Sequence, residues 1–223
     1  MKQHPKESQA TMTPAKALKY LKEGNQRFIQ ALRTDHDHLS TINITKDGQW
    51  PFAVILSCMD SRTSAELIFD QGLGDIFSIR IAGNVITPNV LGSIEFACKI
   101  VGSKLIVILG HNKCGAIRGA CDNVQLGNLT HLVNLIKPAV FAETSNKNNR
   151  NSSNKDFVEK VSNMHVRMSV YRLMDESPVL KDLIEYGDTG IIPAMYDVET
   201  GQVDFFDQEC IINPPKARIE LSA

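Results

Sequence analysis

The chain has 223 residues, of which 43% are hydrophobic, 22% charged and 6% aromatic. This composition excludes a disordered, collagen-like or low-complexity chain. A chain of this length buries roughly 70 to 75% of its unfolded surface, which is enough for one sizeable core. The 24 Lys and Arg residues nearly balance the 25 Asp and Glu residues, so the sequence has no electrostatic footprint for nucleic acid. We expect one domain spanning residues 1–223.

The N-terminal segment, the apolar runs and the cysteines together indicate the cellular compartment of the protein. Residues 1–8 are polar and lack the apolar stretch of a secretory signal, and the longest apolar runs are far too short to span a bilayer. Five cysteines, an odd number, in a chain too large to need disulfides favour a reducing compartment. The sequence therefore predicts a soluble, cytoplasmic protein with free thiols and no membrane partner. The cysteines are Cys58, Cys98, Cys114, Cys121 and Cys210.

The first predicted element is an N-terminal helical arm. Thr13 followed by Pro14 has the pattern of a helix N-cap and a first helical residue, and apolar residues recur after it at helical spacing. We expect the arm to cover about residues 13–33. Residues 34–50 are polar and are predicted to be irregular.

Strand-like and helical stretches alternate in the next part of the chain. Continuous apolar runs bounded by Pro or Gly are typical of strands buried on both faces of a parallel sheet. The predicted strands are 52–56, 76–81 and 105–109, and the predicted helices between them are 64–70 and 89–101. This order predicts a Rossmann-like α/β fold, an open and mostly parallel sheet flanked by helices, with its core over about residues 50–207.

The remaining part of the chain is predicted to be mostly helical. An Asn- and Ser-rich segment at about 144–156 has the composition of a flexible surface insertion. The apolar runs 191–198 and 203–206 flank a Gly-containing turn, which predicts an antiparallel hairpin at the sheet edge. The predicted helices are 116–124, 129–142 and 157–174.

Two polar segments, 57–62 and 110–115, each directly follow a predicted buried strand. Ligands of open α/β sheets bind at the carboxyl ends of the strands. If the two strands are neighbours, we expect Cys58, His111 and Cys114 to converge, with Asp60 beside them. Two thiolates, an imidazole and a carboxylate form a set of ligands that suits Zn²⁺. Asp60 is either a fourth ligand that closes the site or a partner of Arg62 that leaves the fourth position to water.

These residues resemble the motifs of a known family, the β-class carbonic anhydrases. Cys58-x-Asp60-Ser61-Arg62 and His111-x-x-Cys114-Gly115 are similar to the paired zinc motifs of that family, and the segment 74–84 is similar to the stretch between them. The resemblance extends from about residue 13 to residue 207. It implies Zn²⁺ on the two cysteines and the histidine, an Asp60–Arg62 dyad, and an obligate homodimer, or a higher homo-oligomer, with active sites at the subunit interface.

The resemblance also implies substrate-binding residues of the plant-like subtype. Gln49 stands where that subtype has a glutamine that hydrogen-bonds CO2 or bicarbonate. Two differences from the wider family are Ile81, in place of a common Asn, and Ile55, in place of the Trp of the bicarbonate-inhibited subtype. The other predicted pocket residues are Phe77, Ala82, Gly83, Phe96 and Gly115.

The predicted function is reversible hydration of CO2 to bicarbonate and a proton, by attack of zinc-bound hydroxide that the Asp60–Arg62 dyad assists. Two alternatives remain open at this point. The same site could hydrolyse carbon disulfide or carbonyl sulfide, which are linear analogues of CO2. The zinc could instead be closed by Asp60 and only join two strand ends in a non-enzymatic binding module.

Overall fold

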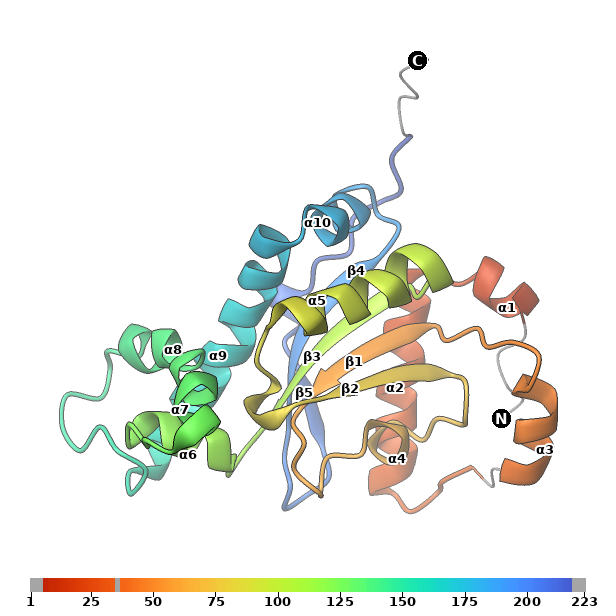
Figure 1. Ribbon diagram of the computed structural model, residues 1–223. Helices are drawn as coiled ribbons and strands as arrows, with labels where there is room; N and C mark the ends of the chain where they lie inside the picture. Colours follow the sequence, from red (N-terminus) through yellow and green to blue (C-terminus); the bar gives the residue numbers. More distant parts are fainter. Residues whose placement is uncertain (1–5, 35–36, 218–223) are drawn as a thin grey trace.

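The structure, a computed structural model, describes residues 6–34 and 37–217 and is built around one five-stranded sheet (Figure 1). The strand order is β2-β1-β3-β4-β5, with β5 antiparallel to β4 and all other pairs parallel. This arrangement confirms the predicted α/β fold and the predicted edge hairpin. The strands are β1 (Ala53–Ser57), β2 (Ile76–Arg80), β3 (Leu105–His111), β4 (Gly190–Tyr196) and β5 (Val203–Phe205).

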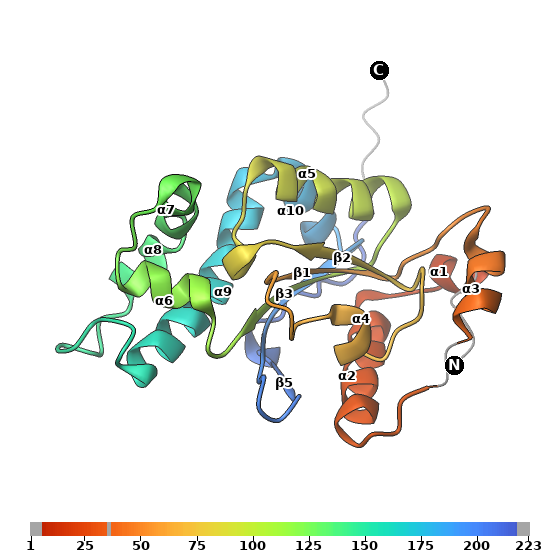
Figure 2. The same cartoon turned by 60° about the horizontal axis from the view of Figure 1, so that its bottom comes forward.

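The sheet has helices on both faces, as Figure 2 shows. Side chains of β1 and β3 that point to one face pack against α2 and α4, and those that point to the other face pack against α5, α9 and α10. β1 and β3 lie inside the sheet and are buried on both faces, which agrees with the continuously apolar runs 53–56 and 105–109 within them. These helices are α2 (Pro14–Ile29), α4 (Ala65–Ile68), α5 (Pro88–Glu95), α9 (Lys155–Glu176) and α10 (Pro178–Glu185).

A third apolar cluster lies beyond the carboxyl ends of the central strands, under α6, α8 and α9. The single helix predicted over 129–142 is divided into α7 and α8, and α8 begins with a Pro in its first turn. The segment predicted as an insertion is held by Arg150, which hydrogen-bonds the carbonyl oxygens of Val140, Glu143 and Asn146. The helices are α6 (Gly115–Cys121), α7 (Gly127–Asn134) and α8 (Lys137–Ala142).

Several helices differ from the sequence prediction. The arm begins as predicted, with the Thr13 hydroxyl accepting a hydrogen bond from Lys16 N–H, but it ends four residues earlier than expected. The segment predicted to be irregular contains α3 (His38–Thr45), and α1 (Lys6–Ala10) begins within the predicted polar tail, whose first five residues lie outside the described part of the chain. A π-helix (Phe96–Val101) continues α5, and α10 was not predicted.

Among the described residues, no helix combines the length and the apolar character that crossing a bilayer requires.

Candidate metal centre

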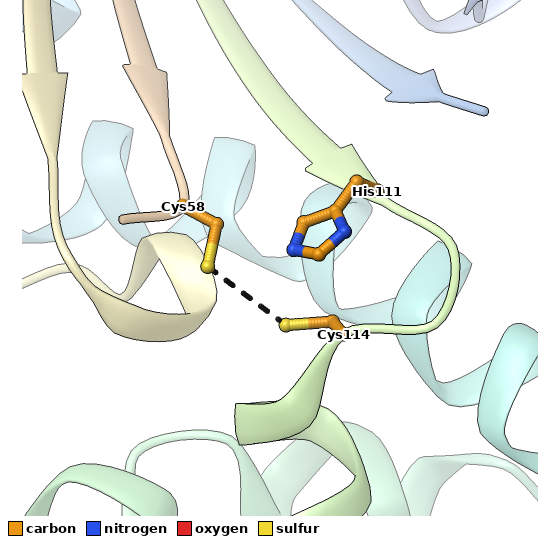
Figure 3. Close-up of side chains that lie close together, drawn as sticks. All are labelled: Cys58, His111 and Cys114. Carbon is orange, nitrogen blue, oxygen red and sulfur yellow. Dashed lines mark hydrogen bonds between the residues drawn. The ribbon is translucent and has the colours of Figure 1, made fainter. Parts of the chain in front are cut away.

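The sheet brings the two predicted motifs together. β1 and β3 are adjacent and parallel, with Ser57 opposite Leu109, so the residues that follow these strands meet at one edge of the sheet. Cys58 directly follows β1, His111 ends β3, and Cys114 is the N-cap of α6 (Figure 3). Their sulfur and ring nitrogen atoms all lie within 4.8 Å of one another, and all three residues are buried. We call these three residues the Cys2His cluster.

The Cys2His cluster fits a zinc ion. The two sulfur atoms are 4.0 Å apart, close to the roughly 3.8 Å that tetrahedral geometry gives with Zn–S bonds of about 2.3 Å. His111 Nδ1 lies 2.8 Å from the carbonyl oxygen of Asn112, to which it donates, so Nε2 keeps its lone pair for a ligand. This Nε2 is buried and has no hydrogen-bond partner among the atoms that the structure describes. A buried nitrogen that faces two sulfurs in this way is what a metal ion would satisfy.

The two cysteines influence each other through a hydrogen bond between their sulfur atoms. This contact lowers the pKa of Cys58 and raises the pKa of Cys114. The backbone N–H groups of Ile117 and Ala116, at the start of α6, lower the pKa of Cys114 by a smaller amount. A bound zinc ion requires both cysteines as thiolates, so its binding would release any proton that the pair carries.

Asp60 and Arg62 form a two-point ion pair beside the cluster. The Arg62 guanidinium donates to the two carboxylate oxygens at 2.9 and 2.8 Å, and Arg62 N–H donates to Oδ1 at 3.0 Å. These hydrogen bonds hold the pKa of Asp60 well below its usual range, so the group is an ionised acceptor. Asp60 Oδ2 lies 4.0 Å from His111 Nε2. The carboxylate thus lies next to the cluster and is held by Arg62. A closed site, in which Asp60 is the fourth zinc ligand, stays a prediction.

Arg80 fixes the segment that carries Cys58 and Asp60. Arg80 ends β2 opposite Ser57, and its guanidinium donates to the carbonyl oxygens of Cys58, Met59 and Asp60 at 3.3, 3.2 and 2.6 Å. Arg80 belongs to the segment 74–84 that resembles the family, but no function was predicted for it. The sequence signal that could have indicated a function was the position of Arg80 at the end of the strand next to β1.

The predicted pocket residues fall into two groups. Gly83 lies at the cluster, where its N–H donates to Cys58 Sγ at 3.3 Å, with Ala82 preceding it, and Gly115 directly follows Cys114. A second group, Gln49, Phe77 and Phe96, is not brought to the cluster within one chain.

These three residues lie toward the other end of β1 and along β2. Gln49 precedes β1, whereas Cys58 follows it. Phe77 pairs with Val54 near the start of β1, and its ring is 6.4 Å from that of Phe96, which is 51% exposed. One chain alone therefore does not assemble the whole predicted pocket.

Comparisons with known proteins agree with this geometry. The family model described as carbonic anhydrase matches residues 53–203. The chain is 38% identical to carbonic anhydrase 2 of Mycobacterium tuberculosis over 85% of this chain and 91% of that protein. It is 34% identical to a carbonic anhydrase of Mycolicibacterium smegmatis, over 86% and 92% of the two chains. A solved β-carbonic anhydrase of Aspergillus fumigatus superposes with a TM-score of 0.64 at 27% identity, covering 86% of this chain and 90% of that one.

The chain therefore belongs to the carbonic anhydrase family. Within this family it is a β-class enzyme, a zinc-dependent lyase, as the paired motifs predicted. The Asp60–Arg62 contact has no function in a zinc site that only joins two strand ends, and both the contact and the family disfavour the non-enzymatic alternative.

Proposed function

We propose that this protein catalyses the reversible hydration of CO2 to bicarbonate and a proton at the Cys2His cluster. The observation that carries the proposal is the position of the ionised Asp60–Arg62 pair next to three buried zinc-type ligands. Three protein ligands leave one position of a tetrahedral zinc site for water or substrate, which is the arrangement of a catalytic site.

In this proposal, each polar group beside the cluster has a separate task. A zinc ion held there would lower the pKa of water and supply a nucleophile near neutral pH. The ionised Asp60 carboxylate would be the hydrogen-bond acceptor for water held at the cluster and would orient it toward CO2, while Arg62 keeps the carboxylate ionised and in place. Arg80 fixes the backbone of the same segment, so the orientation of Asp60 does not depend on one contact.

A second copy of the chain completes the pocket in our proposal. β2 is an end strand, and the ring of Phe96 lies beside Phe77 of this strand. Phe96 and Ile100, which lie in the same helical segment, are 51% and 72% exposed. If the β2 edge packs against a partner, Phe77, Phe96 and Gln49 can line the partner's site, with Ala82, Gly83 and Gly115 lining it from the chain that holds the zinc. Two related proteins of Sordaria macrospora, of the same fold, are described as tetrameric β-carbonic anhydrases. We propose a homodimer as the smallest active unit.

The presence of Gln49 supports assignment to the plant-like subtype. In the proposal this side chain hydrogen-bonds CO2 or bicarbonate from the partner chain. Ile55, which is completely buried, occupies the position where the bicarbonate-inhibited subtype has Trp. We therefore expect no inhibition by bicarbonate at a separate site.

We further propose that the chain is one domain that works in the cytoplasm. All three apolar clusters pack against or beside the single sheet, which supports one domain. All five cysteines are free, which suits a reducing compartment. Fractionation of the source cells would place the protein, and recovery with membranes or outside the cell would contradict the proposed location.

The experiment that tests the proposed function separates zinc binding from catalysis. Stopped-flow CO2 hydration and elemental analysis are measured for the native chain, Asp60→Asn, Arg62→Ala and Cys114→Ser. We expect the first two variants to keep zinc and to lose about 10- to 100-fold in kcat/KM, since outer partners of a metal site act on this scale. Cys114→Ser is expected to lose zinc and activity together.

Two outcomes would overturn the proposal. Near-native rates in zinc-loaded Asp60→Asn would remove the proposed role of the carboxylate. Sulfide release from carbon disulfide or carbonyl sulfide, without CO2 hydration by the native chain, would assign the site to the sulfur analogues instead.

A further inference from the structure

A buried histidine of α9 lies next to the metal centre and has no part in the mechanism above. His165 is 5% exposed, and its Nε2 lies 2.9 Å from the carbonyl oxygen of Gly83. Because a carbonyl oxygen only accepts, Nε2 carries the proton and donates it. Burial lowers the pKa of His165 to about 4, so the ring is neutral near pH 7 and serves as a hydrogen-bond donor without charge.

Gly83 connects this histidine to a metal ligand, because its N–H donates to Cys58 Sγ at 3.3 Å. Its φ of +64° is a left-handed conformation, which glycine adopts without strain. A Cβ here would lie 2.8 Å from Ile136 Cδ1 and 3.1 Å from Ala116 Cβ, so the surrounding side chains close around the bare backbone. One glycine thus offers its oxygen to His165 and its N–H to Cys58, and it has little room to turn.

The N–H···S hydrogen bond matters because Cys58 is a thiolate ligand. A donor aimed at a coordinated sulfur withdraws part of the electron density that the sulfur gives to the metal, and hydrogen bonds to sulfur tune metal centres in this way. Two thiolates already offset the charge of a dipositive ion, so each reduction of their donation leaves the metal a stronger Lewis acid. The orientation of the Gly83 backbone therefore bears on the reactivity of the site.

We propose that His165 is a positioning residue of the metal centre, which acts by holding the Gly83 backbone so that its N–H stays hydrogen-bonded to Cys58 Sγ. The inference rests on the proposed function only in treating the Cys2His cluster as the reactive centre. Without the histidine donor, the Gly83 carbonyl would lose its buried partner and the segment around it would relax.

The test uses the full-length protein with Co²⁺ in place of zinc, because thiolate-to-cobalt charge-transfer absorption reports on the electron density of the sulfurs. We compare His165→Leu, which fills the space without a donor, with His165→Gln, whose side-chain amide can still donate to Gly83. We expect the band of His165→Leu to move to longer wavelength, because Cys58 Sγ loses a hydrogen-bond donor. We expect its zinc affinity, measured by chelator competition, to fall by about 10- to 100-fold, because the relaxed segment no longer holds Cys58 in place. His165→Gln is expected to retain the native band and most of the affinity.

A matched control separates this effect from a loss of packing. Val170→Ala removes a buried side chain from the same helix, and we expect lower stability with an unchanged cobalt spectrum. A native spectrum and native affinity in His165→Leu would overturn the inference, and so would equal losses in His165→Gln and His165→Leu. Absence of CO2 hydration by the native chain would overturn the proposed function instead, since the cobalt band can be read without turnover.

Discussion

At the scale of single residues, the segment between Cys58 and Asp60 is fixed through its backbone. One guanidinium, that of Arg80, reaches three consecutive carbonyl oxygens, and Thr63 Oγ1 donates to the carbonyl oxygen of Cys58 at 2.8 Å. A metal ligand and the proposed water-orienting carboxylate lie at the two ends of this segment. We therefore expect Arg80 to couple zinc binding to the placement of Asp60, although its hydrogen bonds to this segment go to backbone atoms.

Replacement of Arg80 by leucine tests this coupling. We expect Arg80→Leu to lower zinc affinity and kcat/KM together, by about 10-fold or more, since the segment loses its charged donor. The side chain of Arg80→Lys can still donate to one or two of the carbonyl oxygens. We expect its zinc affinity and kcat/KM to lie between those of Arg80→Leu and those of the native enzyme. Arg167→Leu is the control, because it removes an ion pair with Glu209 and no contact with the Cys58 segment. Native zinc affinity in Arg80→Leu would contradict the expectation.

The ligands themselves could be predicted from sequence because each follows or ends an apolar run that a buried strand requires. Parallel strands align their carboxyl ends, so the motifs only needed β1 and β3 to be neighbours. The functions of Arg80 and His165 could not be predicted in this way. Each of them hydrogen-bonds backbone atoms of a distant segment, and no side-chain pattern records which carbonyl oxygen a donor will face.

At the scale of elements, α2 is fixed to the rest of the molecule by an ion pair whose carboxylate is buried. Arg27 Nε lies 2.6 Å from Asp70 Oδ2, and Thr34 donates to the same carboxylate through its N–H and its hydroxyl. Burial alone would raise the pKa of Asp70, but the hydrogen bonds from Arg27 and Thr34 outweigh it, so the pKa is lowered. The ionised carboxylate joins the end of the helical arm to the turn after α4.

This lowered pKa predicts how stability depends on pH. A carboxyl with a lower pKa in the folded than in the unfolded chain contributes stability above its unfolded pKa, about 3.9, and loses that contribution as the pH falls toward the folded value. We expect Asp70→Asn to reduce the free energy of unfolding by about 2 kcal/mol at pH 7, and the difference from the native chain to shrink below about pH 4. Urea unfolding across pH 3 to 7 measures both effects.

The matched control is Asp207→Asn, which removes an exposed ion pair with Lys22. We expect it to change stability by less than about 1 kcal/mol. A constant difference between Asp70→Asn and the native chain over the whole pH range would show that the charge of Asp70 is not what stabilises the arm.

The elements that differ from the sequence prediction do so for different reasons. α3 has its apolar side chains exposed, including Leu39, Ile42 and Ile44, so it lacks the alternation of buried and exposed faces that identifies a helix. α2 ends at Ile29 because the chain turns at Ala31, whose φ is +55°. Nothing in the type of residue at position 31 indicates such a turn. α10 begins with Ser177 and Pro178 as N-cap and first residue, so its start signal was present in the sequence.

At the scale of the whole molecule, the proposed partner surface lies along the β2 edge. We expect the double variant Phe96→Asp, Ile100→Asp to convert a dimer to monomers, because two charges would be buried in an apolar contact. Light scattering measures the assembly, and stopped-flow hydration measures the activity. The monomer should keep zinc, because the ligands belong to one chain. It should lose activity, because the pocket lacks the partner's residues and because Phe96 is itself one of the proposed pocket residues.

Tyr171→Asp is the control for this variant, since Tyr171 on α9 is 70% exposed and lies outside the β2 edge. It should leave both assembly and activity unchanged. Persistence of native assembly after both charges are introduced would place the contact between copies on another face of the molecule.

The separation of the two sulfur ligands along the chain has a consequence for the order of folding. They are 56 residues apart in sequence and meet only after β1 and β3 have paired. This pairing closes a long loop, and its entropic cost arises before the free energy of metal binding can offset it. We therefore expect zinc to bind late in folding and to act mainly by slowing unfolding. Depletion of zinc would then shorten the lifetime of the native protein more than it would delay its formation.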